Sequence, residues 1–90
     1  MYTKEQSDCI EYANQMTKDM RIGNCMVSVS SDEERLIVEF PDRGYESEQS
    51  SENIRDLLES DYPDVVEEWI IEEPMDREGF RSISIEGWWK

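Results

Sequence analysis

Carboxylates are the side chains that this sequence offers for chemistry in quantity. The stretch "ESDYPDVVEEWIIEEP", residues 59–74, carries seven acidic side chains and no basic one. Paired carboxylates can act as general acid and base, but acids are so numerous here that no pair stands out. A glycosidase-type site also needs a sugar cleft that 90 residues scarcely supply. We therefore expect these carboxylates to recognise positive charge rather than to break bonds.

The other residue types argue against most catalytic and metal-binding classes. The chain has no histidine, so it lacks the usual general base, the usual partner of a Ser or Cys nucleophile, and the commonest transition-metal ligand. Cys9 and Cys25 are not in a C-x-x-C arrangement. We expect buried or semi-buried reduced thiols, with a disulfide, or a metal or redox role, as the alternatives. The acidic turns "SDEE" and "DREG" lack the alternating ligands of an EF-hand loop. We expect no enzymatic activity, no metal and no cofactor.

The negative charge is concentrated in one part of the chain. The net charge is −14, and residues 46–78 hold thirteen acids and two bases. Such charge destabilises a small compact domain by self-repulsion, and solubility alone would not require it in one place. It also disfavours direct contact with nucleic acid or an anionic membrane, since binding those surfaces depends on Lys and Arg. The expected partner is a protein with a basic surface.

The first element that must position these groups is a helix over residues 4–21. Thr3 and Gln6 have the T-x-x-Q spacing of a capping box. Gly23 and Asn24 are typical residues for ending a helix. Apolar residues recur near a 3.6 period and predict one buried stripe, formed by Cys9, Ile10, Ala13, Met16 and Met20.

Three period-2 runs predict an antiparallel sheet. "CMVSVS" and "RLIVEF" alternate and are joined by the short polar "SDEE", which is typical of a hairpin. "FRSISIEGWW" is the third strand and pairs with that hairpin. "PDRGYESEQS" is interpreted as a loop, after which Ser50 or Ser51 caps a second helix. Its expected inner face is Ile54, Leu57 and Leu58.

The acidic segment itself can be a helix or a strand. Asp61 is a suitable cap, Pro63 suits a first turn, and Tyr62, Val65, Val66, Trp69 and Ile70 fall within about 140° on a helical wheel. We favour this helix, in which residues 64–73 would place five carboxylates along about 14 Å. That would approach the linear charge density of a nucleic-acid strand. The β-rich run "VVEEWII" leaves a strand open, with a second hairpin around "PMDREG".

These elements predict a single α+β domain over residues 1–90. The sheet is antiparallel and three-stranded, or four-stranded if residues 65–72 are extended, with two or three helices packed on one face. No run of about 18 apolar residues exists, and the N-terminus is too polar for a signal peptide. We expect the protein in the cytoplasm, of the host if the source is viral.

The leading functional hypothesis is a small inhibitor. Its acidic face would enter the nucleic-acid-binding groove of a protein target and block it stoichiometrically. In size and charge the chain is similar to the acidic DNA-mimic inhibitors of phages, directed against restriction or CRISPR defence, and to acidic immunity proteins. The alternatives are a non-catalytic adaptor or antitoxin-type protein that binds mainly through hydrophobic surface, and a homodimer paired through the last strand. The predicted contact residues are Glu52, Asp56, Glu59, Asp61, Asp64, Glu67, Glu68, Glu72, Glu73, Asp76, Trp88 and Trp89.

Overall fold

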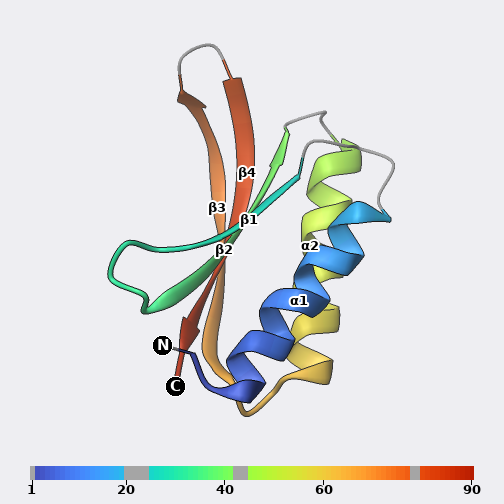
Figure 1. Ribbon diagram of the computed structural model, residues 1–90. Coiled ribbons are helices and arrows are strands. Elements are labelled where there is room, and N and C mark those ends of the chain that lie inside the picture. The colour runs from blue at the N-terminus through green and yellow to red at the C-terminus, as the bar shows by residue number, and fades with distance from the viewer. Residues whose placement is uncertain (1, 20–24, 42–44, 78–79) are drawn as a thin grey trace.

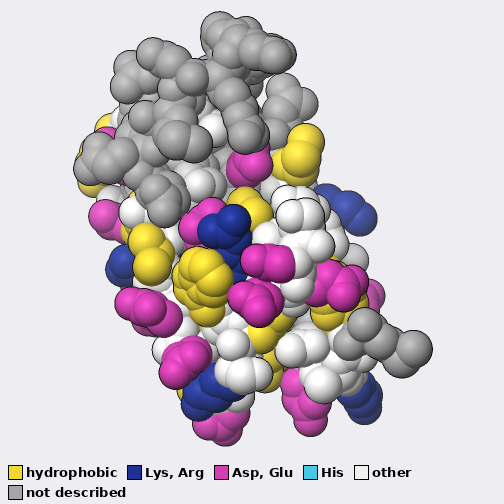
Figure 2. All heavy atoms as spheres, turned by 90° about the vertical axis from the view of Figure 1, so that its left-hand side faces the viewer, with side chains coloured by type: hydrophobic (Ala, Val, Ile, Leu, Met, Phe, Trp, Pro, Cys, Tyr) yellow, Lys and Arg dark blue, Asp and Glu magenta, His cyan; other side chains and the backbone are white. Residues whose placement is uncertain are grey.

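The α+β class is confirmed by a computed structural model, which describes residues 2–19, 25–41, 45–77 and 80–90, with the backbone alone for residues 72–77, 80 and 81. The four strands form one antiparallel sheet in the order β1-β2-β4-β3. Both helices cover one face of this sheet (Figure 1), and the opposite face is open to solvent (Figure 2). The elements are α1 (Lys4–Lys18), β1 (Met26–Val29), β2 (Arg35–Pro41), α2 (Tyr45–Asp61), β3 (Val66–Arg77) and β4 (Phe80–Trp89).

Helix α1 begins at the capping box that the sequence predicts. The Thr3 hydroxyl oxygen accepts from the Gln6 N–H at 3.1 Å, and the Gln6 side-chain oxygen accepts from the Thr3 N–H at 3.0 Å. Cys9 and Ala13 are buried, as the stripe predicts, and Thr17 joins them. The helix ends at Lys18 rather than at residue 21, with Asp19 as its C-cap. Met20, Gly23 and Asn24 lie outside the described residues.

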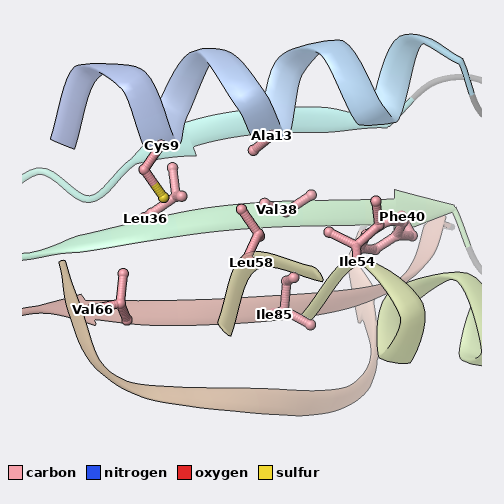
Figure 3. Packing of buried hydrophobic residues seen from close by; sticks show 9 residues of the cluster. All are labelled: Cys9, Ala13, Leu36, Val38, Phe40, Ile54, Leu58, Val66 and Ile85. Atoms are coloured by element: carbon pink, nitrogen blue, oxygen red, sulfur yellow. The ribbon is translucent and has the colours of Figure 1, made fainter. Parts of the chain in front are cut away.

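The predicted hairpin and its pairing with the last strand are confirmed. Strand β2 pairs antiparallel with β1 on one side and with β4 on the other. Alternate residues of β2 and β4 point toward the helices, where Leu36, Val38, Phe40 and Ile85 are completely buried. Figure 3 shows side chains from both helices converging on them. Full burial of each large apolar side chain stabilises the fold by about 1.5–3 kcal/mol.

The second helix is longer than the sequence predicts, because residues 45–50 are helical and not a loop. The polar cluster was misleading, since Ser47 and Ser51 are buried, on the same face as Ile54 and Leu58. Their hydroxyls donate to backbone carbonyls, those of Pro41 and Glu48 respectively, so burial leaves them satisfied. Small side chains on this face let the helix lie close to the sheet. The expected inward position of Leu57 is wrong, since this residue is 45% exposed.

The favoured helix over the acidic segment is wrong, because residues 66–77 form strand β3. A regular strand would place Val66 and Glu68 on the same face. The structure has a register shift between these two residues, so that Val66 pairs with Trp89 and Glu68 with Trp88. This bulge turns Val66 toward the core and leaves Glu67 and Glu68 exposed. The apolar and acidic residues at the start of β3 therefore point to different faces of a strand. Residues 78–79 of the expected second hairpin lie outside the described residues.

A candidate acidic protein-binding surface

Nine carboxylates line one continuous part of the chain, from the start of α2 to the start of β3. Residues 45–71 contain these nine acids and a single base, Arg55. Every one of the nine is exposed. We call this set the acidic band: Glu46, Glu48, Glu52, Asp56, Glu59, Asp61, Asp64, Glu67 and Glu68.

Helix α2 holds the most regular part of the acidic band. Its buried face is Ser47, Ser51, Ile54 and Leu58, and this fixes which residues point outward. Acids recur on the outward side at intervals of four, four and three residues, so they fall in one stripe. The stripe spans about 16 Å, or about 5 Å per carboxylate, against about 3.4 Å per phosphate in one DNA strand. Its members are Glu48, Glu52, Asp56 and Glu59.

The part on β3 is sparser than the sequence predicts. An extended chain rises about 3.3 Å per residue, so residues 66–73, which lie in β3, cover about 23 Å, against about 11 Å for a helix of the same length. The predicted dense ridge of five carboxylates is therefore wrong. Glu67 and Glu68 are exposed where the strand begins. Glu72, Glu73 and Asp76 lie on β3, and their side chains are outside the described residues.

Most carboxylates of the acidic band are free to meet a partner. Arg55 donates to Asp56 at 3.3 Å. The Tyr12 hydroxyl donates to Asp61, and this hydrogen bond is the main reason that the pKa of Tyr12 is raised. The seven other carboxylates make no hydrogen bond or ion pair within the described residues. Solvent counterions that gather around these charges would be released by a basic partner.

The turn between β1 and β2 adds acids across the end of β4 from the start of β3, which sequence reasoning missed. The Trp89 N–H donates to the Glu34 carbonyl at 3.0 Å, and the Lys90 N–H donates to the Val65 carbonyl at 3.1 Å. These two bonds join residues 31–34 to the acidic band across the end of β4. Pairing of distant strands creates this proximity, so no local signal could have revealed it.

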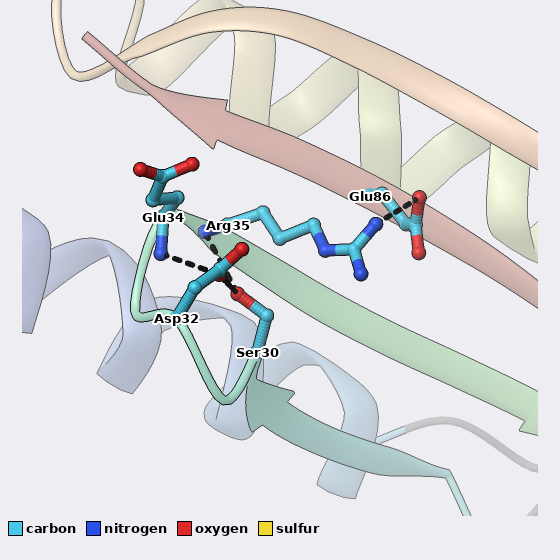
Figure 4. Close-up of polar contacts among 5 residues, drawn as sticks. All are labelled: Ser30, Asp32, Glu34, Arg35 and Glu86. Atoms are coloured by element: carbon cyan, nitrogen blue, oxygen red, sulfur yellow. Dashed lines mark hydrogen bonds and ion pairs between the residues drawn. The ribbon is translucent and has the colours of Figure 1, made fainter.

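That turn is held in shape by its own polar contacts. The Asp32 carboxylate accepts from the Ser30 hydroxyl and from the Glu34 N–H, the latter at 3.1 Å (Figure 4). These bonds lower the pKa of Asp32, the bond from Ser30 most of all. Arg35, which follows the turn, donates its N–H to the Ser30 hydroxyl oxygen at 3.2 Å. Glu33 has a φ of 61°, which this tight turn requires. The carboxylates of this turn are thus held on a defined backbone.

The two tryptophans near the C-terminus have different surroundings. Trp89 pairs with Val66 and packs against the core. Trp88 pairs with Arg35 and Glu68 and lies on the open face of the sheet. The Arg35 guanidinium carbon lies 5.0 Å from the centre of the Trp88 ring. Of the two predicted contact residues, the structure leaves Trp88 on a surface that a partner can reach.

The remaining features offer little for catalysis or metal binding. Cys9 is a buried thiol whose pKa is raised to about 11 by burial, and Cys25 is a half-buried thiol. Within the described residues, no group of three or more His, Cys, Asp or Glu could hold a metal ion. No helix among those residues is long and apolar enough to cross a membrane.

A pocket of about 510 Å³ opens near the acidic turn. It is lined by Tyr2, Gln6, Glu33, Glu34, Trp89 and Lys90. These residues come from the start of α1, the turn and the end of β4, and they do not form a nucleophile–base pair. The pocket therefore indicates no reaction class.

No protein-family model, no curated protein and no solved structure matches this chain. Its function must therefore be inferred from the charge and geometry of its own residues.

Proposed function

We propose that this protein binds the basic, nucleic-acid-binding surface of a protein target through the acidic band and blocks that surface stoichiometrically. The observation that supports this function is the band itself, with nine exposed acids and one base over residues 45–71. These like charges repel one another and destabilise the fold. Solubility alone would not require these charges to lie in one place, so their concentration indicates a function in binding.

The mechanism follows from electrostatics at an exposed surface. Lys and Arg side chains in the groove of the target attract the carboxylates, which speeds encounter and aligns the two proteins. Helix α2 presents Glu48, Glu52, Asp56 and Glu59 from a fixed backbone, so little backbone conformational entropy is lost on binding. A target that processes nucleic acid would place the protein in the cytoplasm, the host's if the source is viral.

The target is first captured from lysate with tagged protein at low and at moderately high salt. Competition against nucleic acid is then measured by fluorescence anisotropy. The test variant is the triple substitution Glu52→Gln, Asp56→Asn and Glu59→Gln. We expect roughly tenfold or greater loss of inhibition, since each exposed charge pair contributes up to about 1 kcal/mol.

A matched control is available on α1. The triple substitution Glu5→Gln, Asp8→Asn and Glu11→Gln removes the same three charges from other exposed positions. It should leave inhibition within about twofold of the unmodified protein, because its three positions lie outside the acidic band. Both variants lose the same net charge, so any effect of net charge or of salt screening is the same for the two. Equal weakening by the two triple variants would contradict a role for the acidic band.

A second candidate function is an adaptor that binds through hydrophobic surface. It is supported by four exposed large apolar side chains, those of Met26, Tyr45, Leu57 and Ile70. A hydrophobic complex persists as salt rises, whereas one held by the acidic band weakens. Capture of a salt-resistant partner that lacks a nucleic-acid groove would support the adaptor.

A further inference from the structure

The face of the sheet that the helices leave uncovered is both apolar and acidic. Strand pairing places Arg35, Trp88 and Glu68 in one row across β2, β4 and β3, and Ile37, Glu86 and Ile70 in the next row. Side chains alternate along a strand, and their neighbours Leu36, Ile85 and Gly87 are buried beneath the helices. These two rows therefore point to solvent, and Figure 2 shows hydrophobic side chains surrounded by acidic ones on this face.

The only base in these rows is already engaged. Arg35 donates to Glu86 at 3.3 Å (Figure 4). Its guanidinium also lies over the Trp88 ring, so its charge is compensated within the face. Ile37, Ile70 and Trp88 then supply apolar surface, with Ile70 37% exposed. Glu39 lies beyond Ile37 on β2 and Glu68 lies on β3. The face therefore places Ile37, Ile70 and Trp88 around the Arg35–Glu86 ion pair, with the carboxylates of Glu39 and Glu68 nearby on β2 and β3.

We propose that this open face docks a segment of a protein partner that presents Lys or Arg next to large apolar side chains. The inference rests on the proposed function and names the contact that gives it specificity, since Glu68 belongs to both the acidic band and the open face. Charge complementarity identifies the occupant. Stacking a second copy on this face would bring Glu39 and Glu68 of two chains, each with a net charge of −14, against one another.

Two synthetic peptides of equal length and charge test this proposal by NMR of the isotope-labelled protein. One alternates Lys with Leu, and the other alternates Lys with Ser. We expect the Lys/Leu peptide to bind about tenfold more tightly, because burial of leucine side chains adds apolar contact. It should shift the amide signals of Ile37, Ile70 and Glu86 and the indole signal of Trp88. Equal affinity of the two peptides, or shifts confined to α2, would overturn the proposal.

One exposed aliphatic residue on the sheet and one on the helices give a pair of variants with similar exposure of the replaced side chain. Ile70→Gln acts on the open face and Leu57→Gln on α2, where the wild-type side chains are 37% and 45% exposed. We expect Ile70→Gln to weaken binding of the Lys/Leu peptide at least fivefold and Leu57→Gln to leave it unchanged. Sedimentation should show a monomer. A dimer that Ile70→Gln dissociates would overturn the proposal by making a second copy the occupant.

The same variants separate this inference from the proposed function once a target is known. If the α2 triple variant releases the target but Ile70→Gln does not, the open face is not the specificity contact and blocking by the acidic band stands. If Ile70→Gln releases the target and the α2 triple variant does not, the proposed blocking function fails instead.

Discussion

At Gly87 of β4, a tryptophan ring lies close against the backbone of the sheet. Trp69 of β3 pairs with Gly87 of β4, and its ring lies across the glycine. A Cβ built there would be 2.5 Å from Trp69 Cζ3. We expect Gly87→Ala to lower the free energy of unfolding by about 1–3 kcal/mol, because the ring must move from its packed position. Urea unfolding measures the change.

A double variant tests the reason for that loss. Trp69→Leu removes the ring and opens space above Gly87. In the Trp69→Leu background, Gly87→Ala should therefore lose most of its effect. An unchanged loss would show that something other than contact with the ring opposes a side chain at position 87.

The Cys9 thiol predicts how stability depends on alkaline pH. Burial raises its pKa from 9.0 to about 11, so the native state holds the proton more tightly than the unfolded chain. The contribution is complete below pH 9 and is lost as pH rises to 11, by about 2–3 kcal/mol. The raised pKa values of Tyr12 and Tyr62 act in the same direction. Cys9→Ala should make the decline in the free energy of unfolding shallower, and an identical decline would contradict this assignment.

At the scale of the element, the capping box of α1 is the clearest local stabiliser. Thr3→Ala removes the acceptor for the Gln6 N–H, and we expect a loss of about 1 kcal/mol in thermal or urea unfolding. Ser7→Ala is the control, since Ser7 is exposed within the same helix and alanine is favoured there by up to about 0.5 kcal/mol. A loss of similar size at both positions would argue against the cap.

Elements with strong local signals were predicted well, and those that depend on their neighbours were not. The capping box and the period-2 runs are patterns of residues that are close together in the sequence. The sequence therefore predicts α1, the first hairpin and β4. The sequence predicts too short a helix α2, because Ser47 and Ser51 are typical of loops. In the fold their hydroxyls donate to backbone carbonyls, which allows them to be buried in the helix. Strand β3 was taken for a helix because its bulge next to Val66 depends on pairing with β4.

At the scale of the whole molecule, the acidic band should oppose stability while serving binding. Glu48, Glu52, Asp56 and Glu59 are one helical turn apart, and each such like-charge pair costs about 0.2–0.5 kcal/mol. The triple variant Glu52→Gln, Asp56→Asn and Glu59→Gln should therefore be more stable than the unmodified protein at low salt. Urea unfolding at low and at physiological ionic strength measures the difference, which should shrink as salt screens the charges. A less stable variant at low salt would contradict the expected repulsion.

The sequence by itself determined the α+β class, the first helix, the antiparallel hairpin and the location of the negative charge. These follow from local hydrogen-bonding patterns, short periodicities and simple counting, which do not require knowledge of distant contacts. The candidate surface was also located in outline, since Glu52, Asp56, Glu59, Asp61, Asp64, Glu67 and Glu68 are exposed as expected.

Only the tertiary structure decided how those residues are arranged. Pairing with β4 made residues 66–77 a strand, which spread the acids that a helix would have concentrated. Pairing of β4 with β2 and with β3 left Trp88 on the open face, packed Trp89 against the core, and placed the turn at residues 31–34 across the end of β4 from the start of β3. Each of these outcomes depends on which strands are neighbours and in what register. Strand register is a property of long-range packing that no single stretch of sequence contains.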